Sequence, residues 1–263
     1  MPPIVNQSTR PRAGDAVAAS DHERQPVDQT FLFADLAGFA ALTEAHGDER
    51  AADLVASFFR DARSLLPAHG AQEVKTLGDA IMIRCESATA AIGLALRLVR
   101  QVGARHGFPR VRAGMHTGAA VERDGDWFGA TVNLAARVSG AAAGGEVLVS
   151  QRTAAAVGAR DGGSLGLVHG LSNIVLRSRG RRQLRNVSEP VELFEVSCEL
   201  SHMFDPLPVD PVCRMAVDPD HDAARLAYDG VEVHFCSLGC AEAFARTPDR
   251  YARTTHSNLA GTE

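Results

Sequence analysis

The chain has 263 residues, 45% of them hydrophobic and 22% charged, and a formal net charge of −5 at pH 7. This composition allows one large globular domain, with or without a small one, and argues against a nucleic-acid-binding protein, which needs a basic face. The apolar run 88–99 contains Arg97 and is too short to span a bilayer. Residues 1–28 lack the apolar centre of a signal peptide, so we expect a disordered leader and a cytoplasmic protein with no membrane partner.

Short apolar runs and amphipathic stretches then alternate along the chain. The first predicted elements are a buried strand over 29–34, a helix over 39–66, and a hairpin with arms 73–75 and 80–84. The later ones are a helix over 88–105, a strand over 111–115, a loop from 118, a helix over 127–139, a strand over 146–150, a short helix over 151–157 and a strand over 191–196. The Gly- and Arg-rich stretch 158–185 shows no clear pattern. Strands, helices and intruding hairpins predict an α/β fold of the split βαβ, ferredoxin-like kind.

The last fifth of the chain has a different character. Three prolines within 206–211 mark a linker. We therefore expect a large domain over 29–198, a linker over 199–209, a small α+β module over 210–253 and a disordered tail over 254–263. A module of this size buries little core, which is where a structural metal usually helps. Five cysteines, an odd count, favour thiols or metal ligands over disulfides.

Two aspartates stand where strands end. Asp35 follows the first predicted strand, and Asp79 lies in the turn of the predicted hairpin. If these strands are neighbours, the two carboxylates meet at one sheet edge, with Gly38 and Gly78 leaving room for phosphate. Hard oxygen ligands of this kind suit Mg²⁺ or Mn²⁺.

Four motifs occur in order between Thr30 and Ser197: FADLAGF, EVKTLGDAIM, VRAGMHTG and DWFGATVNLAAR. Together they resemble the class III adenylate and guanylate cyclase family. The resemblance implies the cyclase fold and an enzyme, a phosphorus–oxygen lyase, that turns a nucleoside triphosphate into a 3′,5′-cyclic nucleotide and pyrophosphate. It also implies two Mg²⁺ or Mn²⁺ ions in each active site.

The resemblance assigns the metal and phosphate positions. It makes Asp35 and Asp79 the metal-binding aspartates, with the backbone carbonyl of Leu36 as a further ligand, and Arg112 a phosphate-side arginine. The run Leu184-Arg185-Asn186 stands where the family has Leu-Lys-Gly, whose lysine contacts the triphosphate. Arg185 keeps the charge with a different donor geometry, and loss of the glycine is expected to reshape that loop.

The resemblance also assigns the base and the transition state. Lys75 and Asp126 match the pair that selects the purine, and a donor with an acceptor complements adenine rather than guanine. Asn133 and Arg137, one helical turn apart, match the residues that orient the ribose and stabilise the transition-state phosphate. Family sites combine the two halves from different catalytic domains, so a single-domain chain is expected to form a head-to-tail homodimer.

Each residue alone has an ordinary structural interpretation. Asp35 could cap the following helix, Gly78-Asp79 could be only a turn, and Asn133 with Arg137 could be a solvated helix face. Their joint occurrence in the family's order favours the functional interpretation. His116 and Cys85 are expected to be buried structural residues.

The C-terminal segments DPVCRMAV, YDGVEVHFCSLGCAEAF and TPDRY, within Asp210–Tyr251, resemble the YHS domain. Cys213, Cys236 and Cys240 match its cysteines, while Arg214 replaces a usual glycine. Three thiolates suit Zn²⁺ or another thiophilic ion, and the alternative is that they are reduced core thiols. His234 is the nearest candidate for a fourth ligand, although it alternates with Phe235 along a strand.

The sequence therefore favours an adenylate cyclase that acts on ATP as a homodimer, with a C-terminal module that modulates it. Two alternatives stay open: a guanylate cyclase, and a catalytically weak nucleotide-binding or metal-sensing signalling protein.

Overall fold

The computed structural model describes residues 28–159, 162–166, 168, 171, 174–198 and 207–251. The expected leader, most of the linker and the tail lie outside these residues. The strands are β1 (Gln29–Leu36), β2 (Ala71–Leu77), β3 (Ala80–Cys85), β4 (Val111–Gly118), β5 (Val121–Arg123), β6 (Asp126–Phe128), β7 (Val147–Ser150), β8 (Ser164–Leu165), β9 (Ile174–Arg182), β10 (Val191–Cys198), β11 (Ala224–Tyr228) and β12 (Val231–Phe235). The helices are α1 (Phe39–His46), α2 (Asp48–Leu65), α3 (Ala88–Arg97), α4 (Ala130–Ala141), α5 (Gln151–Ala156) and α6 (Leu238–Arg246), with a 3-10 turn η1 (Pro67–His69) and a π-helical turn η2 (Leu98–Val102).

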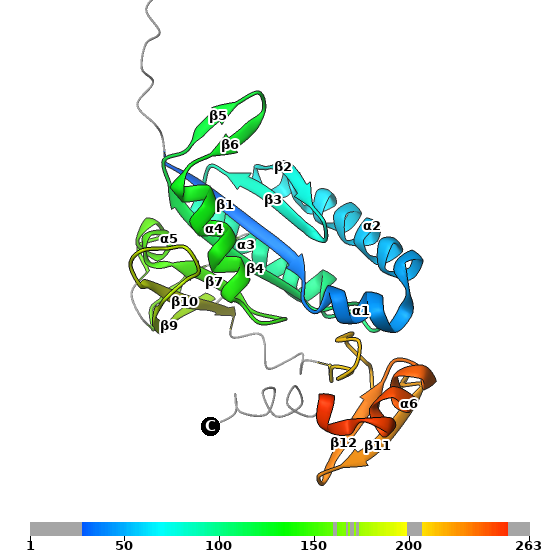
Figure 1. Cartoon of the computed structure of the whole chain (residues 1–263). Coiled ribbons are helices and arrows are strands. Elements are labelled where there is room, and N and C mark those ends of the chain that lie inside the picture. Colours follow the sequence, from blue (N-terminus) through cyan, green and yellow to red (C-terminus); the bar gives the residue numbers. More distant parts are fainter. Residues whose placement is uncertain are drawn as a thin grey trace, which may run out of the picture.

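The large unit is built on one sheet with the strand order β2-β3-β1-β4-β7-β10-β9-β8 (Figure 1). β4 and β7 are parallel, and the other neighbouring strands in this sheet are antiparallel. This arrangement confirms the predicted mixed α/β fold. It places β1 in the centre, with β3 on one side and β4 on the other.

The two faces of β1 follow the alternation of its side chains. Leu32 and Ala34 are buried in the core formed with α1, α2 and α3. Phe31 and Phe33 point to the opposite face, where they pack with Val132 of α4. Asp35 continues the odd-numbered set, so its side chain belongs to the α4 face at the end of the strand.

α4 lies directly on β4, and Gly114 makes this close approach possible. A Cβ at Gly114 would lie 2.0 Å from the backbone nitrogen of Ser139 and 2.3 Å from its Cα. Backbone atoms of a packed helix cannot yield as a flexible side chain can. The Gly114→Ala variant should therefore lose at least about 2 kcal/mol of unfolding free energy, measured by denaturant titration.

Gly140 provides the matched control for that variant, because it lies exposed on α4 and a Cβ there meets no atom within 4 Å. The Gly140→Ala variant should change stability by less than about 1 kcal/mol. Equal losses in the two variants would contradict the close packing of α4 on β4.

Two predicted helices differ from the structure. The helix predicted over 39–66 is divided at Gly47, whose φ of 82° and ψ of 166° end α1 and start α2. The helix predicted over 127–139 is wrong at its start, because residues 126–128 form β6. β6 pairs with β5 through a turn at Asp124 and Gly125, both with positive φ. α4 begins only after Gly129.

The small unit consists of the β11–β12 hairpin and α6 around Phe235 and Phe244, and it lies against the α1 end of the large unit (Figure 1). Its buried residues Val212 and Met215 belong to the same continuous hydrophobic core as the large unit. None of the helices in the described ranges is long and apolar enough to cross a bilayer.

Candidate active site and cysteine cluster

A cluster of two carboxylates and one guanidinium lies where β1 ends. Asp35 faces Arg112 across the β1–β4 pair, and the guanidinium holds both carboxylate oxygens, with Nε to Oδ1 at 2.6 Å and the second nitrogen to Oδ2 at 2.9 Å. Asp79 approaches from the turn between β2 and β3. Burial raises the pKa of the Asp79 carboxyl, and the negative charge of Asp35 raises it further.

This donor set fits a hard divalent cation. Each carboxylate oxygen has two lone pairs, so the Asp35 carboxylate can still bind a metal ion while it accepts the hydrogen bonds from Arg112. Burial raises the free energy of the charged Asp79 carboxylate, and a bound cation would offset that cost. The structure thus brings together Asp35, Asp79 and Arg112 as the sequence predicts.

The two glycines beside the aspartates have different surroundings. Gly78, with φ of 63°, has no atom within 4 Å of where a Cβ would lie. At Gly38 the equivalent position is filled by the side chain of Arg214, whose Cγ would be 2.5 Å from that Cβ. Arg214 comes from the C-terminal unit, so the absence of a side chain at Gly38 accommodates a neighbouring module.

Lys75 and Asp126 form an ion pair on the α4 face of the sheet. The Nζ of Lys75 lies 2.5 Å from Oδ2 of Asp126, and the backbone amide of Trp127 donates to Oδ1 at 2.8 Å. The hydrogen bond from Lys75 lowers the pKa of Asp126. The ammonium also lies 5.7 Å from the ring centroid of Phe128. Both polar groups remain about one third exposed, so a ligand can reach them.

The other predicted residues lie on the surface. Asn133 and Arg137 share an exposed face of α4, and neither side chain has a hydrogen bond or ion pair within the described part of the chain. Arg185 is exposed in the turn between β9 and β10 and joins neither cluster. Asn186 has φ of 60°, the left-handed region that glycine favours and that asparagine enters more readily than most residues. The turn therefore has a glycine-like backbone despite the substitution.

Two residues predicted to be structural are buried. The ring of His116 hydrogen-bonds through Nδ1 to Oγ of Ser150 at 2.6 Å, and burial lowers its pKa to about 4. Cys85 is fully buried in the core, where burial raises the pKa of its thiol to about 12.

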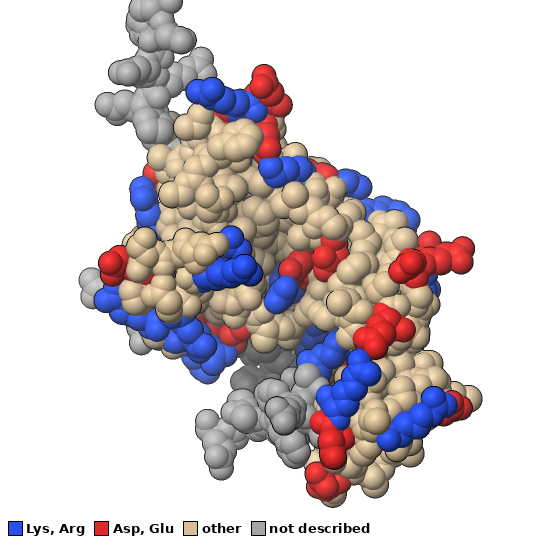
Figure 2. Space-filling view, in the orientation of Figure 1, with Lys and Arg blue, Asp and Glu red and all other residues tan. Residues whose placement is uncertain are grey.

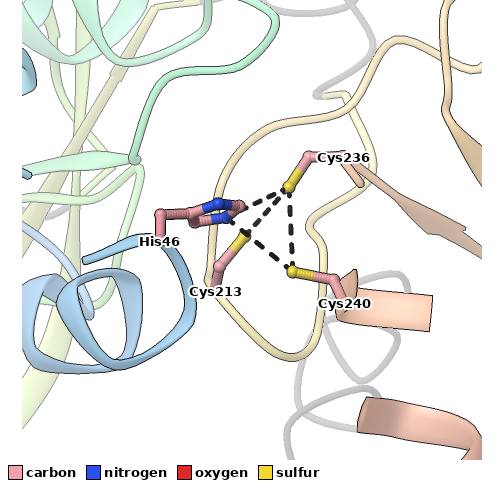
Figure 3. Close-up of side chains that lie close together, drawn as sticks. All are labelled: His46, Cys213, Cys236 and Cys240. Carbon is pink, nitrogen blue, oxygen red and sulfur yellow. Dashed lines mark hydrogen bonds between the residues drawn. The ribbon is translucent and has the colours of Figure 1, made fainter. Parts of the chain in front are cut away.

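Four side chains of a different kind meet at the boundary between the two units (Figure 3). The sulfurs of Cys213 and Cys236 are 3.3 Å apart, and those of Cys236 and Cys240 are 3.9 Å apart. Nε2 of His46, the last residue of α1, lies 3.4 Å from the sulfur of Cys236 and 3.8 Å from that of Cys240. One ligand atom from each residue lies within 4.8 Å of all the others.

The sequence predicts the three cysteines of this cluster but not the histidine. His234 instead binds Asp222 through Nδ1 at 2.8 Å, and its Nε2 faces Glu232. His46 is 190 residues away from Cys236. Its position at the end of α1 depends on the helix break at Gly47, for which Gly47 itself is the sole local signal.

Comparisons with known proteins identify two domains in the chain. Residues 22–175 match the adenylate and guanylate cyclase catalytic domain, and residues 209–255 match the YHS domain. The pH-sensitive adenylate cyclase MT1302 of Mycobacterium tuberculosis is 38% identical over 167 residues, which are 64% of this chain and 40% of that protein. This chain thus spans less than half the length of the curated relatives it matches first.

Solved structures show the same fold. An adenylate cyclase from Trypanosoma brucei, described in its monomeric state, superposes with a TM-score of 0.56 at 26% identity over 73% of this chain and 96% of that one. The adenylyl cyclase CyaB from P. aeruginosa has a TM-score of 0.53 at 22% identity over 66% of this chain and 95% of that one. The family match covers more than half of the sequence. The chain therefore belongs to the adenylate and guanylate cyclase catalytic domain family and carries a YHS domain after the catalytic domain.

Proposed function

We propose that the protein is an adenylate cyclase that converts ATP to 3′,5′-cyclic AMP and pyrophosphate as a homodimer. The observation that carries the proposal is the approach of the Asp35 and Asp79 carboxylates beside Arg112 at the end of β1. Cyclisation brings the ribose 3′-hydroxyl onto the α-phosphorus while pyrophosphate leaves, and it requires metal ligands next to positive charge.

Asp35, Asp79 and the backbone carbonyl of Leu36 would hold two Mg²⁺ or Mn²⁺ ions in each site. When bound, such ions activate the hydroxyl nucleophile and shield the charge of the leaving pyrophosphate. Arg112 orients Asp35 by holding both of its oxygens and offsets the negative charge of the two carboxylates. Its position beside them also supports the phosphate-side role.

Lys75 and Asp126 support adenine as the base. An ammonium only donates hydrogen bonds and a carboxylate only accepts them, so the pair complements N1 and the 6-amino group of adenine. Guanine presents the reverse pattern and would leave both groups mismatched in a partly desolvated site. ATP is therefore the proposed substrate over GTP.

The surface of the α4 face supports a homodimer. Arg137 and Asn133 are exposed, so a nucleotide that they contact would lie on the outer surface of α4, where a second copy of the chain could enclose it. Leu77, beside the β2–β3 turn, is 50% exposed, and Val121 and Phe128, which pair at the open end of the β5–β6 hairpin, are 55% and 51% exposed. Figure 2 shows a broad surface of few charges there, hollowed near its centre where acidic and basic side chains meet.

In this dimer one subunit supplies Asp35, Asp79 and Arg112, and the other supplies Lys75, Asp126, Asn133 and Arg137. Asn133 would orient the ribose, and Arg137 would stabilise charge on the phosphate in the transition state. Arg185 would contact the triphosphate from its exposed turn. We also propose a cytoplasmic protein with domain limits at 29–198 and 210–253.

The Lys75→Ala variant tests the assignment of the base. Loss of the donor should lower kcat/KM for ATP by about 10- to 100-fold and reduce the preference for ATP over GTP by a similar factor. Steady-state kinetics with each nucleotide would measure both values.

The matched control for Lys75→Ala is Arg63→Ala, which breaks an exposed ion pair with Glu73 on the same strand β2. This variant should leave the nucleotide preference unchanged. An unaltered preference for ATP over GTP in Lys75→Ala would show that Lys75 and Asp126 do not select adenine.

The activity itself is tested by incubating purified full-length protein with ATP or GTP and with Mg²⁺ or Mn²⁺. Cyclic AMP formed from ATP supports the proposal, and cyclic GMP formed preferentially from GTP supports the guanylate cyclase alternative. No product from a protein shown to be dimeric would favour a catalytically weak nucleotide-binding or metal-sensing protein.

A further inference from the structure

We propose that His46, Cys213, Cys236 and Cys240 bind one Zn²⁺ ion, so that a histidine of the cyclase domain completes the metal site of the YHS domain. The ion would then bridge two domains rather than stabilise one of them alone. Zinc would join α1, which follows the strand that carries Asp35, to the C-terminal unit.

The distances fit a tetrahedral ion. Bonds of about 2.3 Å to sulfur and about 2.0 Å to nitrogen place neighbouring sulfurs about 3.8 Å apart and a sulfur about 3.5 Å from nitrogen. The sulfur of Cys236 lies 3.3 and 3.9 Å from the other two sulfurs, and Nε2 of His46 lies 3.4 and 3.8 Å from the sulfurs of Cys236 and Cys240. In Figure 3 the four side chains converge from separate elements onto one point.

The ligand set selects the kind of metal. Three thiolates with one imidazole match the closed four-ligand sites that hold structural zinc, and they do not suit Mg²⁺, which prefers oxygen. Cys213 and Cys240 are buried, while His46 and Cys236 are partly accessible, which leaves a path for entry of the ion. A closed set leaves no coordination position for a substrate, so the role is structural.

Neighbouring groups hold the ligands in place. The buried carboxylate of Asp210 accepts hydrogen bonds from the backbone amides of Cys213 at 3.3 Å and Cys236 at 2.9 Å, and thereby fixes two ligand loops together. The hydroxyl of Ser237 caps α6 and accepts from the amide of Cys240 at 3.1 Å. The backbone of each cysteine ligand is therefore held in place by a hydrogen bond to a neighbouring side chain.

The domain boundary is already closely packed at this point. The amide of Gly107 donates to the carbonyl of Ala216 at 2.8 Å, and the amide of Ala216 donates to the carbonyl of Phe108 at 2.9 Å. Arg214, with φ of 68°, fills the space above Gly38, three residues after Asp35. A zinc ion held by His46 would thus fasten the C-terminal unit next to the loop that follows β1.

Metal binding by the full-length protein tests the assignment of His46. Wild type should bind one Zn²⁺ per chain, and Co²⁺ in its place should give the visible and charge-transfer absorption of a tetrahedral thiolate site. His46→Ala should weaken zinc binding on the order of 100-fold and change the Co²⁺ spectrum.

Two control variants distinguish His46 from the described histidines of the C-terminal unit. His221 is exposed and bound to Asp218, and His234 is bound to Asp222. The His221→Ala and His234→Gln variants should each keep the affinity and the spectrum of wild type. Loss of the spectrum in His234→Gln with none in His46→Ala would overturn the proposal, as would absence of zinc binding by wild type.

Hydrogen exchange tests the bridge separately and without relying on activity. Zinc should slow exchange of the amides in α1 as well as in the C-terminal unit of wild type, compared with chelator-treated protein. In His46→Ala, zinc should no longer slow exchange in α1. Equal protection of α1 by zinc in both proteins would show that His46 does not carry the bridge.

Discussion

Replacing Asp35 or Asp79 with alanine should lower cyclic AMP formation by at least about 1,000-fold, because either change removes a proposed ligand of the catalytic ions, whose charge stabilisation is several kcal/mol. Both carboxylates lie near the end of β1, and the cluster that they form with Arg112 holds no third acidic side chain among the described residues that could take over as a ligand. Initial rates with Mg²⁺ and Mn²⁺ would measure the loss.

Stability must be followed in the same variants. Asp35→Ala leaves the partly buried Arg112 without its bidentate partner, so Asp35→Asn, which keeps the side-chain shape, is the second variant. Asp53→Ala is the control, because Asp53 is exposed on α2 and should leave the rate unchanged. Substantial activity in folded Asp35→Asn and Asp79→Ala proteins would contradict the metal assignment.

The Arg137→Ala variant should lower kcat by about 100- to 1,000-fold with a much smaller change in KM, because the guanidinium is proposed to act on charge that develops in the transition state. Stability should hardly change, since Arg137 is exposed and unpaired within the described residues. Rates over a range of ATP concentrations would separate the two constants.

Arg60→Ala is the matched control for Arg137→Ala. Arg60 is an exposed arginine on α2, which covers the opposite face of the sheet from α4. This variant should keep the wild-type kcat. A KM effect in Arg137→Ala with unchanged kcat would assign Arg137 to substrate binding alone.

The elements that hold the proposed site residues could be predicted from the sequence because their signals are local. An apolar run ends at Asp35, a Gly-Asp turn presents Asp79, and helical spacing puts Asn133 and Arg137 on one face of α4. The structure has β1 ending one residue beyond Asp35, the β2–β3 turn at Asp79 and α4 with both residues exposed.

The helix predicted over 127–139 starts too early because a hairpin precedes α4. Asp124-Gly125 is a two-residue hairpin signal with both residues at positive φ, and it explains why Trp127 lies in a strand. The same dipeptide at Asp229-Gly230 joins β11 to β12. The Asp124-Gly125 turn thus puts Asp126 at the start of a strand, where it meets Lys75.

Contacts between distant segments could not be predicted in this way. The apolar period of 39–66 continues across Gly47, so the break that positions His46 is hidden in the pattern. Arg214 adopts a left-handed backbone where the related domain usually has glycine, and its side chain meets Gly38. The contact between Arg214 and Gly38 depends on how two domains pack, and local patterns carry no information about that.

The central claim is a shared site between two copies of the chain, and mixing inactive variants tests it most directly. An Asp35→Ala subunit keeps Arg137, and an Arg137→Ala subunit keeps Asp35, so their heterodimer has one intact site. When equal amounts exchange freely, half of the dimers should be heterodimers, each with one of its two sites intact. The mixture should therefore recover about one quarter of the wild-type rate, while each variant alone stays inactive. No recovery, despite subunit exchange shown by mass spectrometry, would contradict a site built from both subunits.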